Sequence, residues 1–219
     1  DLDDRVSIVR FNHLAEAVVP MTPVSSTAAP TQDDVRQSIR NNIAPADGNT
    51  AIAAGAGTAF AELAAPRPTA PPVLRKAVVV LSDGKENTGF ESPAGSGNWF
   101  SILGGTRSEP LPSVADVETD SLVVPSDIKV YTVGLGLTSD INPAELEALA
   151  TPGDFFHVDG DLSGSKYFQL EKYYTQIFMD IADLATISDP MYWIDPGRRH
   201  EIEFDVLRGD VRAMVVLYD

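Results

Sequence analysis

Apolar and polar residues follow two different patterns in the segments of this chain that are expected to form strands. Residues 5–11 alternate between apolar and polar positions, which is typical of a strand with one buried face, and residues 16–21 form a second short strand. Residues 76–81 and 128–134 are continuous apolar runs rich in β-branched residues, which is typical of parallel strands covered on both faces. Residues 155–158 are expected to add a short edge strand.

Helical periodicity follows or separates these strands. Thr31 is a predicted N-cap, with acidic residues in the first turn that suit the helix dipole. The expected helices are residues 31–43, 50–65, 142–151 and 170–185. Strands that alternate with helices predict an α/β fold with a doubly wound, mostly parallel sheet and helices on both faces. We expect this domain to span residues 1–187.

The pattern changes after residue 188. Residues 192–194, 201–207 and 212–217 are predicted strands joined by Pro-Gly and Gly-Asp turns. No helix is expected between them, so they would pair antiparallel. So short a segment cannot form an independent sandwich. Residues 188–219 are therefore either the start of a second β domain or an extension of the first.

Composition removes several classes of function. The formal net charge of -16 argues against nucleic acid as a partner, because binding it needs a basic surface. The absence of cysteine excludes disulfides and cysteine-based zinc sites within this sequence. No apolar run approaches the length of a membrane span, roughly 20 residues. The acidic balance suits divalent cations or basic surfaces, although acidity for solubility alone is the simpler interpretation.

Two polar residues are expected at the carboxyl edge of the sheet, where ligands bind in folds of this class. Asp83 directly follows the apolar run 76–81, and Thr50 opens a helix after a Gly-Asn turn. A carboxylate and a hydroxyl are hard oxygen donors that suit Mg²⁺ or Ca²⁺. The alternatives are that Asp83 belongs only to a turn and that Thr50 is only a helix cap. We predict that the two residues lie close together.

The chain resembles the von Willebrand factor A-type domain family over roughly residues 4–185. The resemblance rests on an ordered set of segments, each weak alone: Asp4 to Phe11, Gly48-Asn49-Thr50-Ala51-Ile52, Val78 to Gly84, Ile128 to Gly136, and Glu145 to Val158. It implies a Rossmann-like fold with a metal-ion-dependent adhesion site, in which Thr50 and Asp83 are metal ligands. It also implies that an acidic group on a protein partner completes the coordination.

Two departures from the family pattern bear on this site. Ser82 replaces the usual threonine before Asp83, and the family's Asp-x-Ser-x-Ser motif is missing from its family position, ahead of the strand that corresponds to residues 5–11. The strand that carries this motif is central in the family's sheet, between the strands that correspond to residues 5–11 and 76–81. We therefore predict that these two strands do not pair directly. We expect little metal affinity unless the missing ligands are supplied from residues upstream or from another segment.

A long polar, glycine-containing segment follows Asp83 and is predicted to border the site. Its candidate ligand-binding residues are Lys85, Asn87, Trp99 and Phe100. The two aromatic residues are of the type found in binding hot spots. The alternative is that they fold back and cover the domain.

Three hypotheses about function follow, and none is enzymatic. The first is an adhesion or assembly module that recognises an acidic group on a protein through a divalent cation. The second is a structural module of a larger multidomain protein with a lost or incomplete metal site, and the third is a regulatory subunit of an intracellular machine. A hydrolase with Asp83 as nucleophile would need a basic partner that the sequence does not nominate. The β segment after residue 188 favours a secreted or cell-surface protein resembling bacterial multidomain members, with a cytoplasmic location as the alternative.

Overall fold

The computed structural model describes six stretches of the chain and two isolated residues. These are residues 4–12, 15–24, 31–42, 50–65, 75–85 and 122–183, with residues 197 and 201. The chain divides into two compact units, residues 1–166 and 167–219, and each is described by itself. The predicted boundary at residue 188 and the strands expected beyond it lie outside the described residues, so they stay predictions.

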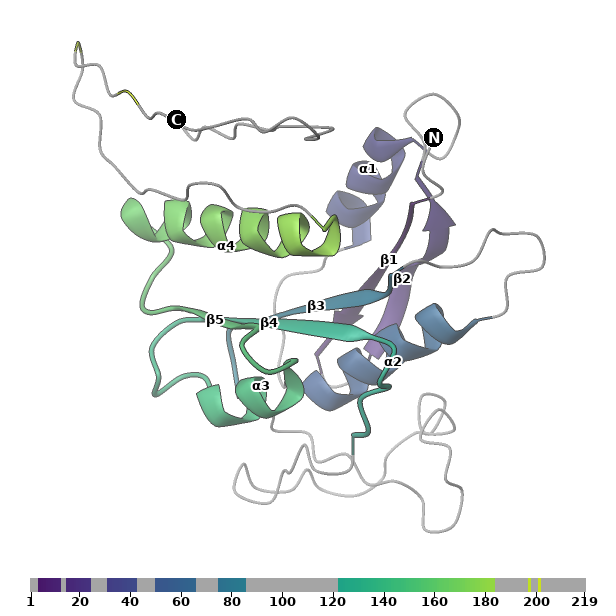
Figure 1. The fold of residues 1–219 in the computed structure, drawn as a ribbon, viewed down its shortest axis with the longest axis horizontal. Coiled ribbons are helices and arrows are strands. Elements are labelled where there is room, and N and C mark those ends of the chain that lie inside the picture. The colour runs from purple at the N-terminus through teal and green to yellow at the C-terminus, as the bar shows by residue number, and fades with distance from the viewer. Residues whose placement is uncertain are drawn as a thin grey trace, which may run out of the picture. The chain divides into compact units, whose positions relative to one another are not determined.

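The described strands form two sheets (Figure 1). Strand β1 (Arg5–Phe11) pairs antiparallel with β2 (Ala15–Pro23), which is longer than the predicted 16–21. The parallel sheet has the order β3-β4-β5, with β3 at Ala77–Ser82, β4 at Lys129–Leu135 and β5 at Phe155–Val158. A parallel sheet accompanied by helices confirms the predicted α/β class.

Burial differs between the two strands that were predicted to be covered on both faces. The prediction is confirmed for β4, whose five central residues are all buried. It is wrong for β3, in which Val79 and Leu81 on one face are 36% and 39% exposed while Val78 and Val80 on the other are buried. Among the described strands, β4 has a neighbour on each side whereas β3 pairs with β4 alone. The alternation arises because one face of β3 packs against helix α2 in the core and the other face is left partly exposed.

Strands β1 and β3 do not pair directly within the described residues, as predicted, and they belong to different sheets. Helix α2 (Ile52–Ala64) contacts β1, β2 and β3, and therefore connects the two sheets. Its small residues allow this close approach. A methyl group added at Gly55 would lie 2.6 Å from Phe11 Cδ1, so the strand packs directly against the helix backbone.

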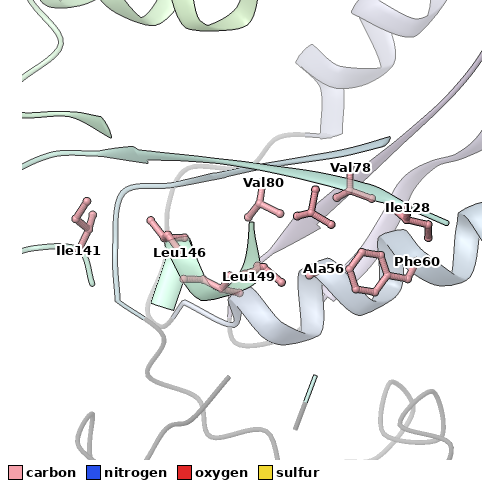
Figure 2. Close-up of a cluster of buried hydrophobic side chains, with 10 residues drawn as sticks. Ala56, Phe60, Val78, Val80, Ile128, Ile141, Leu146 and Leu149 are labelled. Carbon is pink, nitrogen blue, oxygen red and sulfur yellow. The ribbon is translucent and has the colours of Figure 1, made fainter. Parts of the chain in front are cut away.

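The main core of the first unit lies between helices α2 and α3 (Pro143–Leu149) and the parallel sheet (Figure 2). It contains these buried side chains: Ile52, Ala56, Phe60, Val78, Val80, Ile128, Val130, Ile141, Leu146 and Leu149. Phe11 of β1 and Phe155 of β5 pack against this cluster. Both sheets therefore share one hydrophobic core, which fixes the carboxyl end of β3 relative to the start of α2.

Helix α1 (Gln32–Asn42) begins with the predicted cap. The Asp34 backbone N–H donates to the Thr31 hydroxyl over 3.3 Å, and the Thr31 backbone N–H donates to the Asp34 carboxylate over 2.7 Å. The Thr31 hydroxyl also donates to that carboxylate over 2.8 Å. These bonds, the backbone one first, lower the pKa of Asp34. The reciprocal arrangement is a capping box in which aspartate takes the place of glutamate.

Most of the described residues of the second unit belong to helix α4. This helix spans Ser165–Ile181, so it begins and ends earlier than the predicted range of residues 170–185, and Ile177 on it is fully buried. None of the described helices is long and apolar enough to cross a membrane.

Candidate metal-binding site at the carboxyl end of β3

A tight turn follows the last residue of β3. The Ser82 hydroxyl donates to the Gly84 carbonyl over 3.0 Å and accepts from the Gly84 N–H over 3.3 Å. Asp83 lies between these two residues, and its side chain is exposed. The turn therefore presents the Asp83 carboxylate at the carboxyl edge of the sheet, where ligands of this fold class bind.

Thr50 lies against the same turn. It precedes Ala51, which occupies the N-cap position of α2, so the helix begins one residue later than a threonine cap would require. A methyl group added at Gly84 would lie 2.7 Å from Thr50 Oγ1. The Thr50 hydroxyl is thus packed against the residue that follows Asp83. The structure brings together the two residues that the sequence nominated, and their role as metal ligands stays a prediction.

The two candidate ligands carry the oxygen donors that a hard cation prefers, but two ligands are too few to hold it. Gly84 leaves room for the Thr50 hydroxyl in a place that any side chain would fill, and the preceding residue, Asp83, carries an exposed carboxylate. Ca²⁺ takes 6–8 oxygen ligands and Mg²⁺ keeps near-octahedral geometry. Within the described ranges, no three His, Cys, Asp or Glu residues form a group that could hold a metal. As candidate ligands, Thr50 and Asp83 would make up only part of a site, and further oxygen ligands would be needed.

The remaining candidate residues are only partly described. Lys85 follows the turn directly and is half-buried. Asn87, Trp99 and Phe100 lie outside the described residues, so their predicted place beside the site stays a prediction. In the sequence, Ser82 is notable only as a departure from the family pattern, whereas in the structure its hydroxyl closes the turn around Asp83. A serine two residues before a glycine at a strand end is a weak signal for such a turn.

The neighbouring strand ends are joined by backbone contacts. The Gly136 N–H after β4 donates to the Val158 carbonyl of β5 over 3.0 Å, and His157 Nε2 lies 2.8 Å from the Gly136 carbonyl oxygen. The His157 ring also stacks on Phe155 with ring centroids 6.3 Å apart. These contacts give His157 a packing role at this edge of the sheet.

A comparison with protein families decides the identity of the domain. The profile of the von Willebrand factor type A domain matches residues 1–171 of this chain. The chain belongs to this family. Domains of the family often mediate metal-dependent protein interactions through the metal-ion-dependent adhesion site, and they are generally non-enzymatic adhesion or structural modules.

Solved structures with a similar fold include other von Willebrand factor A (vWA) proteins. Proximal thread matrix protein 1 from the mussel byssus is 18% identical, with 83% of this chain and 37% of that chain covered and a TM-score of 0.48. The same mussel protein with a zinc-occupied adhesion-site motif is 17% identical, with 82% and 36% covered and a TM-score of 0.48. The von Willebrand factor type A protein from Catenulispora acidiphila is 14% identical, with 80% and 33% covered and a TM-score of 0.47. The chain thus spans about a third of the length of these proteins, and a comparison with curated proteins finds no match.

The contact between Gly84 and Thr50 gives a test of this vWA site that leaves both candidate ligands in place. Gly84→Ala should push the Thr50 hydroxyl aside, because its new methyl group would lie 2.7 Å from Thr50 Oγ1. We expect the affinity of the complete protein for Mg²⁺ to fall by about tenfold or more, in the range typical of damage next to a metal ligand. Isothermal titration calorimetry measures it. In a Thr50→Ala background, Gly84→Ala should cause no further loss, and an additive loss would show that the two residues act independently.

Proposed function

We propose that the complete protein contains a metal-assisted binding module that recognises an acidic group on a protein partner through a divalent cation. One observation carries this proposal: the Thr50 hydroxyl packs against Gly84, next to the exposed carboxylate of Asp83. The two candidate donors therefore lie next to the same glycine at the carboxyl edge of a sheet, in a chain of the vWA family.

The chemistry of this donor set explains the choice of an acidic partner. A hydroxyl ligand such as that of Thr50 is neutral, so a dication held by it and one carboxylate keeps part of its positive charge. A carboxylate from a partner is then a favourable additional ligand, because hard cations prefer oxygen donors. Mg²⁺ or Ca²⁺ fits these donors, and the related mussel protein has been solved with zinc in its site. When bound, the cation would supply the positive charge that attracts the partner.

The remaining ligands would come from an Asp-x-Ser-x-Ser motif on a strand between β1 and β3. Those two strands contact the same helix, α2, and do not pair with each other. A strand inserted between them would pair with backbone groups on both sides, as in strand addition to an open sheet edge. The segment Asp161-Leu162-Ser163-Gly164-Ser165 has this residue spacing, but it follows β5 and leads into α4. The motif does not stand in its family position in this sequence, so we expect the chain to bind cations weakly by itself.

The segment after Lys85 would contribute to the choice of partner. It leaves the sheet at the turn that carries Asp83, which supports a position near the site. Lys85 and Asn87 would add polar contacts, and Trp99 or Phe100 would supply an aromatic anchor of the type enriched in hot spots. A cell-surface or secreted location suits such a module.

Cation binding tests the proposal directly. Two fusions would carry a strand joined ahead of Asp1 by a Gly-Ser linker, one with Asp-x-Ser-x-Ser and one with alanine at the three motif positions. We expect the first fusion to bind Mg²⁺ or Ca²⁺ at least ten times more tightly than the second, because metal affinity rises with the number of charged and oxygen ligands. Calorimetric titration with the metal alone measures this ratio. Equal affinities in the two fusions would contradict the proposal.

Such a result would favour the second candidate, a structural module with an incomplete metal site. The observation behind this candidate is that the described residues contain no group of three potential acidic or histidine ligands. A structural module would keep its partner contacts in the presence of EDTA, whereas a metal-assisted one would lose them.

A further inference from the structure

The buried hydroxyl of Ser82 has a different environment from the other buried hydroxyls of the described chain. Thr58 donates to the Ala54 carbonyl within α2, and Thr132 donates to the Leu146 carbonyl of α3. Both bonds stabilise the core. The Ser82 hydroxyl instead makes its two bonds to Gly84, around the exposed residue Asp83.

The position of Ser82 is fixed by the sheet. It is the last residue of β3, is 4% exposed, and lies opposite Gly134 in the parallel ladder with β4. A hydroxyl held so firmly can define the path of the next two residues. Because it both donates to Gly84 and accepts from it, the turn has one preferred form. Buried hydroxyls need such partners, since an unsatisfied one costs free energy.

The turn in its closed form also determines where Thr50 lies. Gly84 is the residue tied by Ser82, and it is the residue against which Thr50 Oγ1 packs. An open turn would move Gly84 away from the Thr50 hydroxyl and let the Asp83 carboxylate change its position. The two candidate donors would then have to be ordered again each time a cation binds, which lowers affinity because the ordering costs entropy.

We propose that Ser82 is a positioning residue, which preorganises Asp83 and Thr50 for a cation through its two hydrogen bonds to Gly84. This inference rests on the proposed function and adds to it a residue that does not itself touch the metal. The Ser82 hydroxyl faces Gly84 and not the exposed edge, so its effect on the cation is indirect.

The test compares Ser82→Ala with Ser82→Thr in the complete protein. Ser82→Ala removes both hydrogen bonds, and we expect the dissociation constant for Mg²⁺ to rise about tenfold, as for other groups that orient metal ligands. Ser82→Thr keeps a hydroxyl on the same carbon and should restore the affinity to within about twofold, given that a hydroxyl of either residue makes the same bonds. Isothermal titration with Mg²⁺ alone gives both values. Thr58→Ala is the matched control, because it removes a buried hydroxyl from α2 and should leave the affinity unchanged.

A second measurement does not need the metal. Without the Ser82 hydroxyl, the Gly84 amide loses its acceptor and should exchange its hydrogen faster, which NMR detects in the cation-free protein. An unchanged Mg²⁺ affinity in Ser82→Ala, or a Ser82→Thr variant as weak as Ser82→Ala, would overturn the positioning role. If Asp83→Ala binds Mg²⁺ as well as the wild type does, the proposed function itself fails, so the two failures are distinguishable.

Discussion

Replacing Asp83 with alanine in the complete protein should abolish cation-dependent partner binding and barely change its stability. The Asp83 side chain is exposed and has no hydrogen-bond partner among the described residues. Its loss would remove the carboxylate of the two-residue donor set without disturbing the core. We expect the free energy of unfolding to change by less than about 0.5 kcal/mol, the usual range for surface substitutions. Titration with Mg²⁺ and urea unfolding measure the two effects.

Asp159 offers a closely matched control. It is an exposed aspartate that directly follows strand β5 and precedes a glycine, as Asp83 follows β3 and precedes Gly84. Asp159→Ala therefore makes the same change in charge and size at the end of another parallel strand. Equal losses of binding in the two variants would point to a general effect of negative charge. Binding that survives Asp83→Ala and EDTA would instead support the structural module.

The largest loss of stability is expected from Phe60→Ala in helix α2. The Phe60 side chain is 3% exposed and belongs to the core cluster between α2 and the parallel sheet (Figure 2). Truncation removes apolar contacts and leaves a cavity, and for buried phenylalanine the cost is about 3–5 kcal/mol. The midpoint of urea unfolding should move to a lower concentration with an unchanged slope, as two-state unfolding requires.

Phe178→Ala makes the same chemical change at an exposed position. This side chain is 64% exposed on helix α4, so we expect a change of less than about 0.5 kcal/mol. A loss for Phe60→Ala that is no larger than that for Phe178→Ala would mean that the α2 core contributes little to folding.

The sequence pattern predicted the strands well because the burial of a strand determines the order of apolar and polar residues along it. It could not separate β3 from β4, since both have the pattern of a strand covered on both faces. In the structure one face of β3 leaves Val79 and Leu81 exposed, and β3 has one neighbour among the described strands whereas β4 has two. Local sequence carries little information about which strand lies at an edge, because the edge is defined by segments far away in the chain.

The residues of the candidate site could be predicted from the sequence, but the contacts between them could not. Thr50 and Asp83 follow from the order of elements, since each stands where an element meets the carboxyl edge of the sheet. The packing of Thr50 Oγ1 against Gly84 depends on how α2 sits on β3, which no local pattern encodes. The hydrogen bonds of Ser82 depend on the path of one turn, and the sequence Ser-Asp-Gly permits several.

The contacts of helix α2 affect how the first unit unfolds. It contacts the antiparallel pair through β1 and β2 and the parallel sheet through β3, and it contributes Ile52, Ala56 and Phe60 to their common core. Opening either sheet alone would expose apolar surface of this helix to solvent, so partial opening costs free energy. The amide hydrogens in the middle of α2 should therefore exchange with solvent only through an event that opens both sheets, at a free energy close to that of global unfolding. Two separate hydrogen-bonded ladders would then behave as one cooperative foldon, with α2 as its slowest-exchanging element.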